Sequence, residues 1–374
     1  MHDNRTIKRT TSWPLTPALI VFLVLASSAV FLQAASASPA ATRPAAVATK
    51  KSKANVIHYV TLQKRRYLYL HEVAAYYNLS YTISGKTNAH KVTLSNPRWG
   101  TKLEFTENSV AMTINGTTAA LCYPILPYKG RFMLENTDFS EFLDPIMRPA
   151  RVPRRIVRTI MLDAGHGGTD HGAEVDGVME KTLNLAMVKR VGAILTKRGY
   201  RVLYTREKDT TMALSARSAA AKAKQPALFL SIHCNSTTQK SINGIEVFIA
   251  NPAGVPSYGT KTLGQAAPAT KYNHINALWA YYTQKDLTKA TKALDRGVKR
   301  KQFYVVRETP APSMLVEIGF LSNDAERKKL LQAEYQDKIA VALCDAIDKL
   351  TKAVRPPVKP ASTAPPKAGT AGKK

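Results

Sequence analysis

From residue 156 onward, short apolar runs alternate with longer amphipathic stretches, and this alternation restricts the fold more than any other feature of the sequence. The apolar runs predict buried strands at 156–164, 200–206, 227–235, 244–251 and 313–323. The stretches between and after them predict helices at 182–199, 214–224, 276–294 and, as one or two helices, 324–350. Such alternation is typical of one α/β domain, here 156–350, with a mostly parallel central sheet and helices on both faces.

A small α+β domain is predicted ahead of this region, at 55–147. The Asn115-Gly116 pair stands between two alternating runs, which is a strong signal for a hairpin turn. A helix is expected just after residue 67, and its buried face would carry Leu70, Val73, Ala74 and Tyr77. The basic, proline-containing segment 148–158 marks the boundary between the two domains.

The N-terminus has the pattern of an export signal. A basic start precedes an apolar stretch at 14–32, and a small-residue cleavage pattern follows at 35–37. We interpret 1–37 as a secretory signal peptide. A retained membrane anchor is the alternative, because the apolar stretch is close to spanning length. Residues 38–54, rich in Ala, Pro and Lys, are predicted to be a linker.

The charge of the chain is strongly unbalanced, with 54 Lys+Arg against 26 Asp+Glu and a net charge of +28. Such a chain attracts polyanions. Export argues against nucleic acid and favours a cell-envelope polymer, with the periplasm as the first expected location and membrane contact limited to the signal segment. The tail at 351–374, basic and rich in proline, is predicted to be disordered. Three scattered cysteines, Cys122, Cys234 and Cys344, exclude a disulfide scaffold or a Cys-ligated zinc module.

Candidate catalytic residues stand where the predicted strands end. His166 follows one strand inside the sequence DAGHGG, His233 lies near the end of the strand at 227–235, and Glu317 lies within the strand at 313–323. Glu180 stands at the start of the first long helix. Sites in sheets of this kind form beyond the carboxyl ends of the strands, so these side chains are expected to meet.

Two histidines and a glutamate suit Zn²⁺, because catalytic zinc commonly has three His or Asp/Glu ligands and an open fourth position. We assign His166, Glu180 and His233 as zinc ligands. Zinc activates a water molecule and polarises the bond that is attacked. Glu317 would act as general base, and a carboxylate inside an apolar strand is costly to bury unless it has such a role. The glycines around His166 are expected to allow a tight turn and to leave room near the metal.

Alternative interpretations remain for these residues. His171, Glu174 and Asp176 are rival ligands in the middle of the same loop. Each of the four assigned residues could also have a merely structural role. Glu180, for example, could be an acid that the helix dipole favours in the first turn.

The segments at 160–209, 214–221, 227–236, 244–251, 303–326 and 335–343 together resemble the zinc-dependent N-acetylmuramoyl-L-alanine amidases of the type 3 family. The resemblance covers about 156–350. It implies hydrolysis of the amide between N-acetylmuramic acid and L-alanine in peptidoglycan. It also implies the same three zinc ligands and the same catalytic glutamate. Peptidoglycan would be the substrate, and an activator protein is a further candidate partner.

The sequence departs from the family pattern in two places near the site. Ala164 stands where the family usually has proline, and Cys234 stands where it usually has a small residue. Cys234 is expected to point away from His233 and to serve in packing, because neighbouring strand residues face opposite sides. Residues 55–147 resemble the small domain named after the N-terminus of copper amine oxidases, which implies wall or protein binding without a copper site.

Two other functions compete with a secreted zinc amidase. One is an inactive wall-binding regulator, which the loss of any of the four assigned residues would favour. The other is a zinc peptidase on a related sheet. A peptidase would need an arginine that binds a terminal carboxylate. No arginine stands out for this role, and Arg206, Arg217 and Arg307 are left open as candidates.

Overall fold

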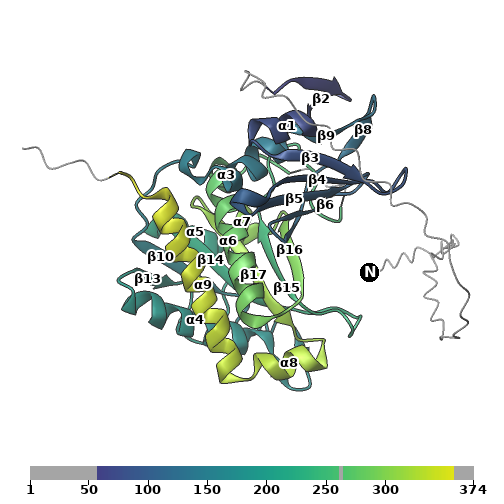
Figure 1. The fold of residues 1–374 in the computed structure, drawn as a ribbon. Helices are drawn as coiled ribbons and strands as arrows, with labels where there is room; N and C mark the ends of the chain where they lie inside the picture. The colour runs from purple at the N-terminus through teal and green to yellow at the C-terminus, as the bar shows by residue number, and fades with distance from the viewer. Residues whose placement is uncertain (1–56, 261–263, 358–374) are drawn as a thin grey trace, which may run out of the picture. The chain divides into compact units, whose positions relative to one another are not determined.

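The structure is a computed structural model that describes residues 57–260 and 264–357 (Figure 1). The predicted signal peptide, the linker and most of the predicted tail lie outside the described residues and stay predictions. Among the described residues, none of the helices combines the length and the apolar character that crossing a bilayer requires.

The first part of the described chain is a mixture of strands and short helices. Its elements are β1 (Tyr59–Leu62), β2 (Arg65–Tyr69), α1 (Leu70–Tyr76), β3 (Ser80–Ser84), β4 (Lys91–Asn96), β5 (Thr101–Thr106), β6 (Ala111–Ile114), β7 (Thr117–Ala120), β8 (Leu126–Tyr128), β9 (Arg131–Glu135), α2 (Asn136–Asp138) and α3 (Asp144–Met147). Strands β1, β2, β9 and β8 form one antiparallel sheet, and β3 to β7 form an antiparallel run within a second sheet.

Two local predictions in this part are confirmed. Asn115 and Gly116 form the two-residue loop between β6 and β7, and both have positive φ, 50° and 80°. Positive φ at both positions is the requirement of the hairpin turn that matches the twist of the strands. Helix α1 buries Leu70, Val73 and Ala74 on the predicted face.

The second part has the expected α/β alternation. Its elements are β10 (Thr159–Ala164), β11 (Glu174–Val175), β12 (Val178–Met179), α4 (Glu180–Lys197), β13 (Arg201–Tyr204), α5 (Leu214–Lys224), β14 (Leu228–Asn235), β15 (Ile245–Ile249), α6 (Asn273–Thr291), β16 (Asp295–Arg300), α7 (Tyr304–Arg307), β17 (Ser313–Phe320), α8 (Asp324–Leu330) and α9 (Ala333–Val354). Its strands run in the order β13-β10-β14-β17-β15-β16. They are parallel except that β15 runs against β17, so the prediction of a mostly parallel sheet is confirmed.

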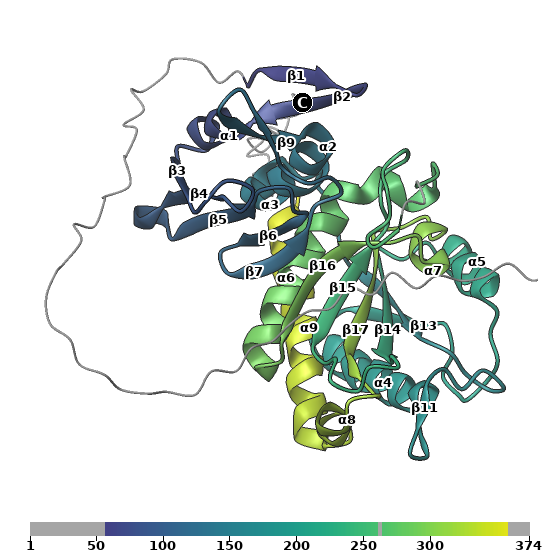
Figure 2. The same ribbon diagram turned by 90° about the vertical axis from the view of Figure 1, so that its right-hand side faces the viewer.

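Helices cover both faces of this sheet. Helices α4, α6 and α9 lie on one face, and α5 and α7 lie on the other (Figures 1 and 2). The large core forms under the first three helices. A smaller cluster joins the second face to α5 and α7 through the side chains of Met161, Ala221, Phe229, Val305 and Leu315.

One strand and one boundary differ from the sequence prediction. Strand β16 was not predicted, because its sequence DRGVKR is mostly charged. Its cations are satisfied by buried acids, as Lys299 pairs with Glu246 and Arg300 pairs with Asp138. Helix α9 extends beyond the predicted end of the domain at 350, because Val354 is still buried against the core.

The two parts of the described chain share one sheet. Strand β7 pairs in parallel with β16, so β3 to β7 continue the sheet of the second part. The Asp295 carboxylate also accepts a hydrogen bond from the Thr118 N–H at 2.7 Å. At the segment 148–158 the chain therefore changes from antiparallel strands to the mostly parallel α/β arrangement. The strands on the two sides of this segment nevertheless belong to one hydrogen-bonded sheet.

Candidate metal centre

His233 and Glu317 lie side by side on adjacent parallel strands. They are register partners on β14 and β17, so both side chains project from the same face of the sheet. This is the face that carries α5 and α7. Cys234 points the other way and is fully buried in the large core, as the alternation of a strand predicts.

His166 lies in the turn that follows β10, with a left-handed backbone φ of 60°. This conformation is unfavourable for residues other than glycine, so the surroundings must hold it. Arg217 donates hydrogen bonds to the carbonyl oxygens of Ala164 and His166 at 2.6 and 2.7 Å. Arg206 donates to those of Ala164 and Gly165 at 3.1 and 3.0 Å. The two guanidinium groups fix the turn that presents the His166 ring.

Two glycines of this loop leave space for the side chains of the centre. A Cβ atom on Gly165 would lie 2.2 Å from Cε1 of His233. A Cβ atom on Gly172 would lie 2.6 Å from Oε2 of Glu180 and 2.7 Å from Cδ2 of His166. The glycines next to His166 were expected to leave room for metal and substrate; Gly165 and Gly172 leave room for the candidate ligands themselves.

Substitution of Gly165 by alanine should therefore displace the His233 ring. We expect the affinity for zinc to fall by about 10- to 100-fold, the range found when the support of a ligand is lost. Titration of the metal-free protein with zinc against a competing chelator measures this change. Gly177→Ala in the same loop is the control for a general loss of loop stability, because its added Cβ would meet nothing within 4 Å while its φ of 74° disfavours alanine. Equal zinc affinities of the two variants would contradict the role of Gly165.

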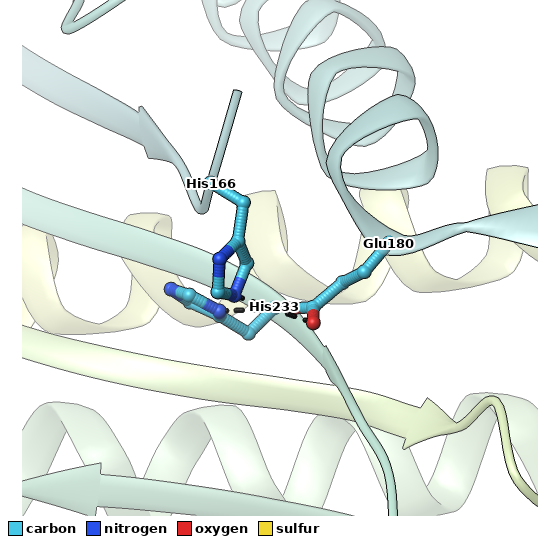
Figure 3. Close-up of side chains that lie close together, drawn as sticks. All are labelled: His166, Glu180 and His233. Atoms are coloured by element: carbon cyan, nitrogen blue, oxygen red, sulfur yellow. Dashed lines mark hydrogen bonds and ion pairs between the residues drawn. The ribbon is translucent and has the colours of Figure 1, made fainter. Parts of the chain in front are cut away.

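Glu180, the first residue of α4, extends its carboxylate toward both histidines from one side (Figure 3). Its Oε1 is 2.9 Å from Nδ1 of His233, and its Oε2 is 3.3 Å from Nε2 of His166. The backbone N–H groups of Cys234 and Ala173 donate to the same two oxygens at 3.2 and 3.0 Å. The chain thus holds the Glu180 carboxylate from both sides in a fixed orientation.

The charges of these groups are strongly coupled. Burial disfavours the ionised Glu180, but hydrogen bonds with His166 and His233 outweigh it and lower the pKa of the Glu180 carboxyl far below its ordinary value. Burial also disfavours protonated His166, yet the Glu180 and Asp170 carboxylates outweigh it and raise the pKa of His166. The centre is a buried anion flanked by two imidazoles, which is an environment that attracts a cation.

The donor set fits a zinc ion. One ring nitrogen from each histidine and one carboxylate oxygen of Glu180 all lie within 4.8 Å of one another. Imidazole nitrogen and carboxylate oxygen are usual zinc donors, and three of them leave a fourth position open. The predicted ligands are therefore brought together from three separate elements: the loop after β10, the start of α4 and strand β14.

The rival ligands of the loop form other contacts. Nδ1 of His171 lies 3.0 Å from Oε2 of Glu174, and Asp176 forms an ion pair with Arg327. Asp170, which sequence reasoning overlooked, lies with its Oδ2 2.9 Å from Nδ1 of His166. A carboxylate behind a ligating histidine orients its ring and fixes its tautomer.

Glu317 and the three candidate ligands line one pocket of about 410 Å³. Burial raises the pKa of Glu317 well above its ordinary value, the Glu180 and Glu246 carboxylates add to this, and Lys301 opposes it. Its Oε2 has no hydrogen-bond partner among the described residues. A buried carboxylate oxygen left without a partner is available to accept a proton.

Glu246 lies beside Glu317 on β15 and was not identified from the sequence. The two glutamates are register partners on neighbouring strands. Glu246 forms ion pairs with Lys299 and with Arg296, and it accepts a hydrogen bond from Asn235 at 2.8 Å. These contacts engage the Glu246 carboxylate, whereas Glu317 has an oxygen without a partner among the described residues and lines the pocket.

The arginines considered as carboxylate clamps do not serve that role in the structure. Arg206 and Arg217 are buried and bind the carbonyl groups of the His166 loop. Arg307 forms an ion pair with Glu308. Each of the three arginines thus has other partners in the structure, and none of them supports the peptidase alternative.

The Arg217–Asp163 ion pair beneath the loop should contribute strongly to stability. Both side chains are buried and lie 2.6 Å apart. Arg217→Met leaves the Asp163 charge without a cation, and we expect the free energy of unfolding to fall by about 3–5 kcal/mol. Urea unfolding measures it. Asp163→Asn in the same chain should restore part of the loss, and a loss below about 1 kcal/mol in the single variant would show that the pair is unimportant.

Comparison with known proteins identifies the family. The family model of N-acetylmuramoyl-L-alanine amidases matches residues 160–349. The chain belongs to this amidase family. The match covers the α/β part, and residues 57–147 lie outside it, so their resemblance to another small domain stays a prediction.

Relatives of this amidase family member include two proteins of Bacillus subtilis (strain 168). The uncharacterized protein YqiI is 37% identical over 193 residues, which are 51% of this chain and 84% of YqiI. The N-acetylmuramoyl-L-alanine amidase LytC is 37% identical over 187 residues, which are 50% of this chain and 34% of LytC. The catalytic domain of the amidase CwlV from Bacillus (Paenibacillus) polymyxa is 30% identical, covers 53% of this chain and 99% of that domain, and has a TM-score of 0.45.

Proposed function

We propose that the chain hydrolyses the amide bond between N-acetylmuramic acid and L-alanine in peptidoglycan, with Zn²⁺ as cofactor. The observation that carries the proposal is the pocket in which Glu317 accompanies His166, Glu180 and His233. Membership of the amidase family supports the choice of bond. The presence of all four side chains in one pocket favours an enzyme over an inactive wall-binding regulator.

His166, Glu180 and His233 would hold the ion. Zinc bound there supplies a Lewis acid that polarises the amide carbonyl and activates the attacking water. Asp170 keeps the His166 ring in place, and the N–H groups of Ala173 and Cys234 keep the Glu180 carboxylate in place. These contacts hold the donor atoms without contribution from the substrate.

Glu317 would move the proton that the hydrolysis requires. Its Oε2 would accept a proton from the attacking water and then deliver it to the nitrogen that leaves with L-alanine. The positive charge of a bound cation favours the ionised carboxylate and would counteract the effect of burial on its pKa. One carboxylate can therefore act first as base and then as acid.

The pocket has an apolar wall on the side of α5 and α7. It consists of Leu214, Phe303, Tyr304, Val305 and Leu315. Leu214 is 55% exposed and Tyr304 is 37% exposed, although both side chains are largely apolar. We infer that this wall contacts the apolar parts of the substrate next to the amide and limits the access of bulk water.

We place the reaction in the cell envelope, because the predicted signal peptide directs the chain out of the cytoplasm. The test uses the exported protein loaded with zinc and incubated with purified peptidoglycan, with products identified by mass spectrometry. Free peptides that begin with L-alanine should appear, should vanish with a chelator and should return when zinc is added. Binding of peptidoglycan without release of peptides, in the presence of zinc, would contradict the proposal.

A further inference from the structure

A cleft with a strong positive charge lies away from the candidate metal centre. This basic cleft has a volume of about 340 Å³, and Arg154, Arg155, Lys271 and Asn273 are among its lining residues. Glu141 is the acid that lines it. Arg155 and Lys271 lie over the Tyr272 ring, 5.4 and 5.0 Å from its centroid. The tyrosine therefore holds two cations at the same opening.

Hydrogen-bonding groups in the basic cleft are left without partners. The Nε atom of Arg155 is buried and has no hydrogen-bond partner among the described residues. Asn273 is only 5% exposed, and its Oδ1 likewise lacks a partner within that part of the chain. Buried polar groups are normally satisfied, and an amide can turn either its oxygen or its nitrogen toward a ligand. These groups indicate a place for a polar ligand.

The helix that begins at the basic cleft adds further positive potential. Helix α6 is 19 residues long, and it starts at Asn273 without a side-chain cap and without an acid in its first turn. The Asn273 N–H already donates to the Thr270 carbonyl of the short 3₁₀ helix (Pro268–Tyr272) that precedes α6, so α6 contributes only the positive end of its dipole, which favours an anion. Cations approach from several sides, which suits the non-bridging oxygens of a tetrahedral phosphate group better than the coplanar oxygens of a carboxylate.

A second cavity shares Arg155 with the first. It has a volume of about 290 Å³ and is lined by Arg155, Arg158 and Arg355, with no acid among its lining residues. Arg158 and Lys271 are exposed and form no ion pair within the described residues. Two adjoining cationic cavities fit two neighbouring charges of one chain better than a single small anion.

This surface lies at the opposite end of β10 from the metal centre. Arg155 and Arg158 precede the strand, and His166 follows it. The strand has six residues, so its length separates the two places by about 20 Å. A ligand bound at the basic cleft would leave the catalytic pocket open.

We propose that the basic cleft and the adjoining cavity bind consecutive phosphate groups of an anionic envelope polymer. The site would hold the enzyme near its substrate without taking part in the reaction. The proposal goes beyond the hydrolysis proposed above and does not depend on it, because none of its residues lines the catalytic pocket.

The test compares two double variants of the whole chain that lose the same charge. Arg158→Gln/Lys271→Gln removes one exposed cation from each cavity. Lys328→Gln/Lys329→Gln removes two exposed cations from α8 and is the control. Binding of a soluble poly(glycerol phosphate) is measured by calorimetry at several salt concentrations. We expect about tenfold weaker binding for the first variant at low salt and a much smaller change for the control.

Further arms separate phosphate recognition from a general effect of charge and from lipid binding. Glycerol phosphate monomer should bind far more weakly than the polymer, and polyglutamate should bind alike to both variants. Unchanged melting temperature would show that the first variant is folded, and Glu317→Gln should bind the polymer like the natural chain. If both double variants lost affinity for the polymer equally, the change in net charge alone would explain the loss. That result would contradict the proposal. A loss seen only with phosphatidylglycerol vesicles would assign the surface to lipid and overturn the proposal.

Discussion

Replacement of Glu317 by glutamine should abolish hydrolysis while zinc stays bound. Glutamine has nearly the same shape but cannot accept the proton of the attacking water, and general-base catalysis is commonly worth about 10²- to 10⁴-fold in rate. We expect the rate of peptide release to fall by about a thousandfold or more. Glu317 is not among the converging donors, so the zinc content of the purified variant should match that of the natural chain.

The measurement requires both readouts on one preparation. Peptide release is followed by mass spectrometry, and zinc is determined by elemental analysis. Glu334→Gln on α9 is the matched control, because Glu334 is exposed and its ion pair within the described part of the chain is with Lys338, one helix turn away. A Glu317→Gln protein that keeps both zinc and full activity would exclude the assigned base. A variant that loses zinc would make Glu317 a ligand instead.

Replacement of His166 by alanine should remove zinc and activity together. Loss of the carboxylate behind a ligand weakens metal binding by about 10- to 100-fold, so loss of the ligand itself should weaken it by more than about a hundredfold. In Glu317→Gln the rate of peptide release should fall while the zinc content stays the same. In His166→Ala both should fall.

The matched control for this change lies in the same loop. His171 pairs with Glu174 and is not one of the donors that converge within the described residues. His171→Ala should keep zinc and activity. If His171→Ala lost zinc while His166→Ala kept it, His171 rather than His166 would be the ligand. That result would overturn the assigned centre.

The strands and the candidate ligands could be predicted because their signals are local. Apolar runs mark β10, β14 and β17 without reference to the rest of the chain. The chemistry-bearing residues stand at fixed places relative to those runs. Parallel strands then bring residues near their ends to one edge of the sheet, as His166 and His233 illustrate.

The supporting groups could not be predicted, because they come together only in three dimensions. Asp163, Arg206 and Arg217 belong to β10, to the residues after β13 and to α5, and no spacing in the sequence links them. Strand β16 was missed for a similar reason. Its charges look like a solvated loop until buried partners such as Glu246 are placed opposite them.

The pairing of β7 with β16 has a consequence for how the gene can be dissected. A fragment trimmed at the boundary near residue 150 would expose one side of β16 as an open edge. It would also leave Arg300 buried without Asp138. Open edges recruit strands from other molecules. Poor solubility of such a fragment would therefore indicate that the sheet was cut between β7 and β16. The α/β region is better expressed together with the strands that precede it.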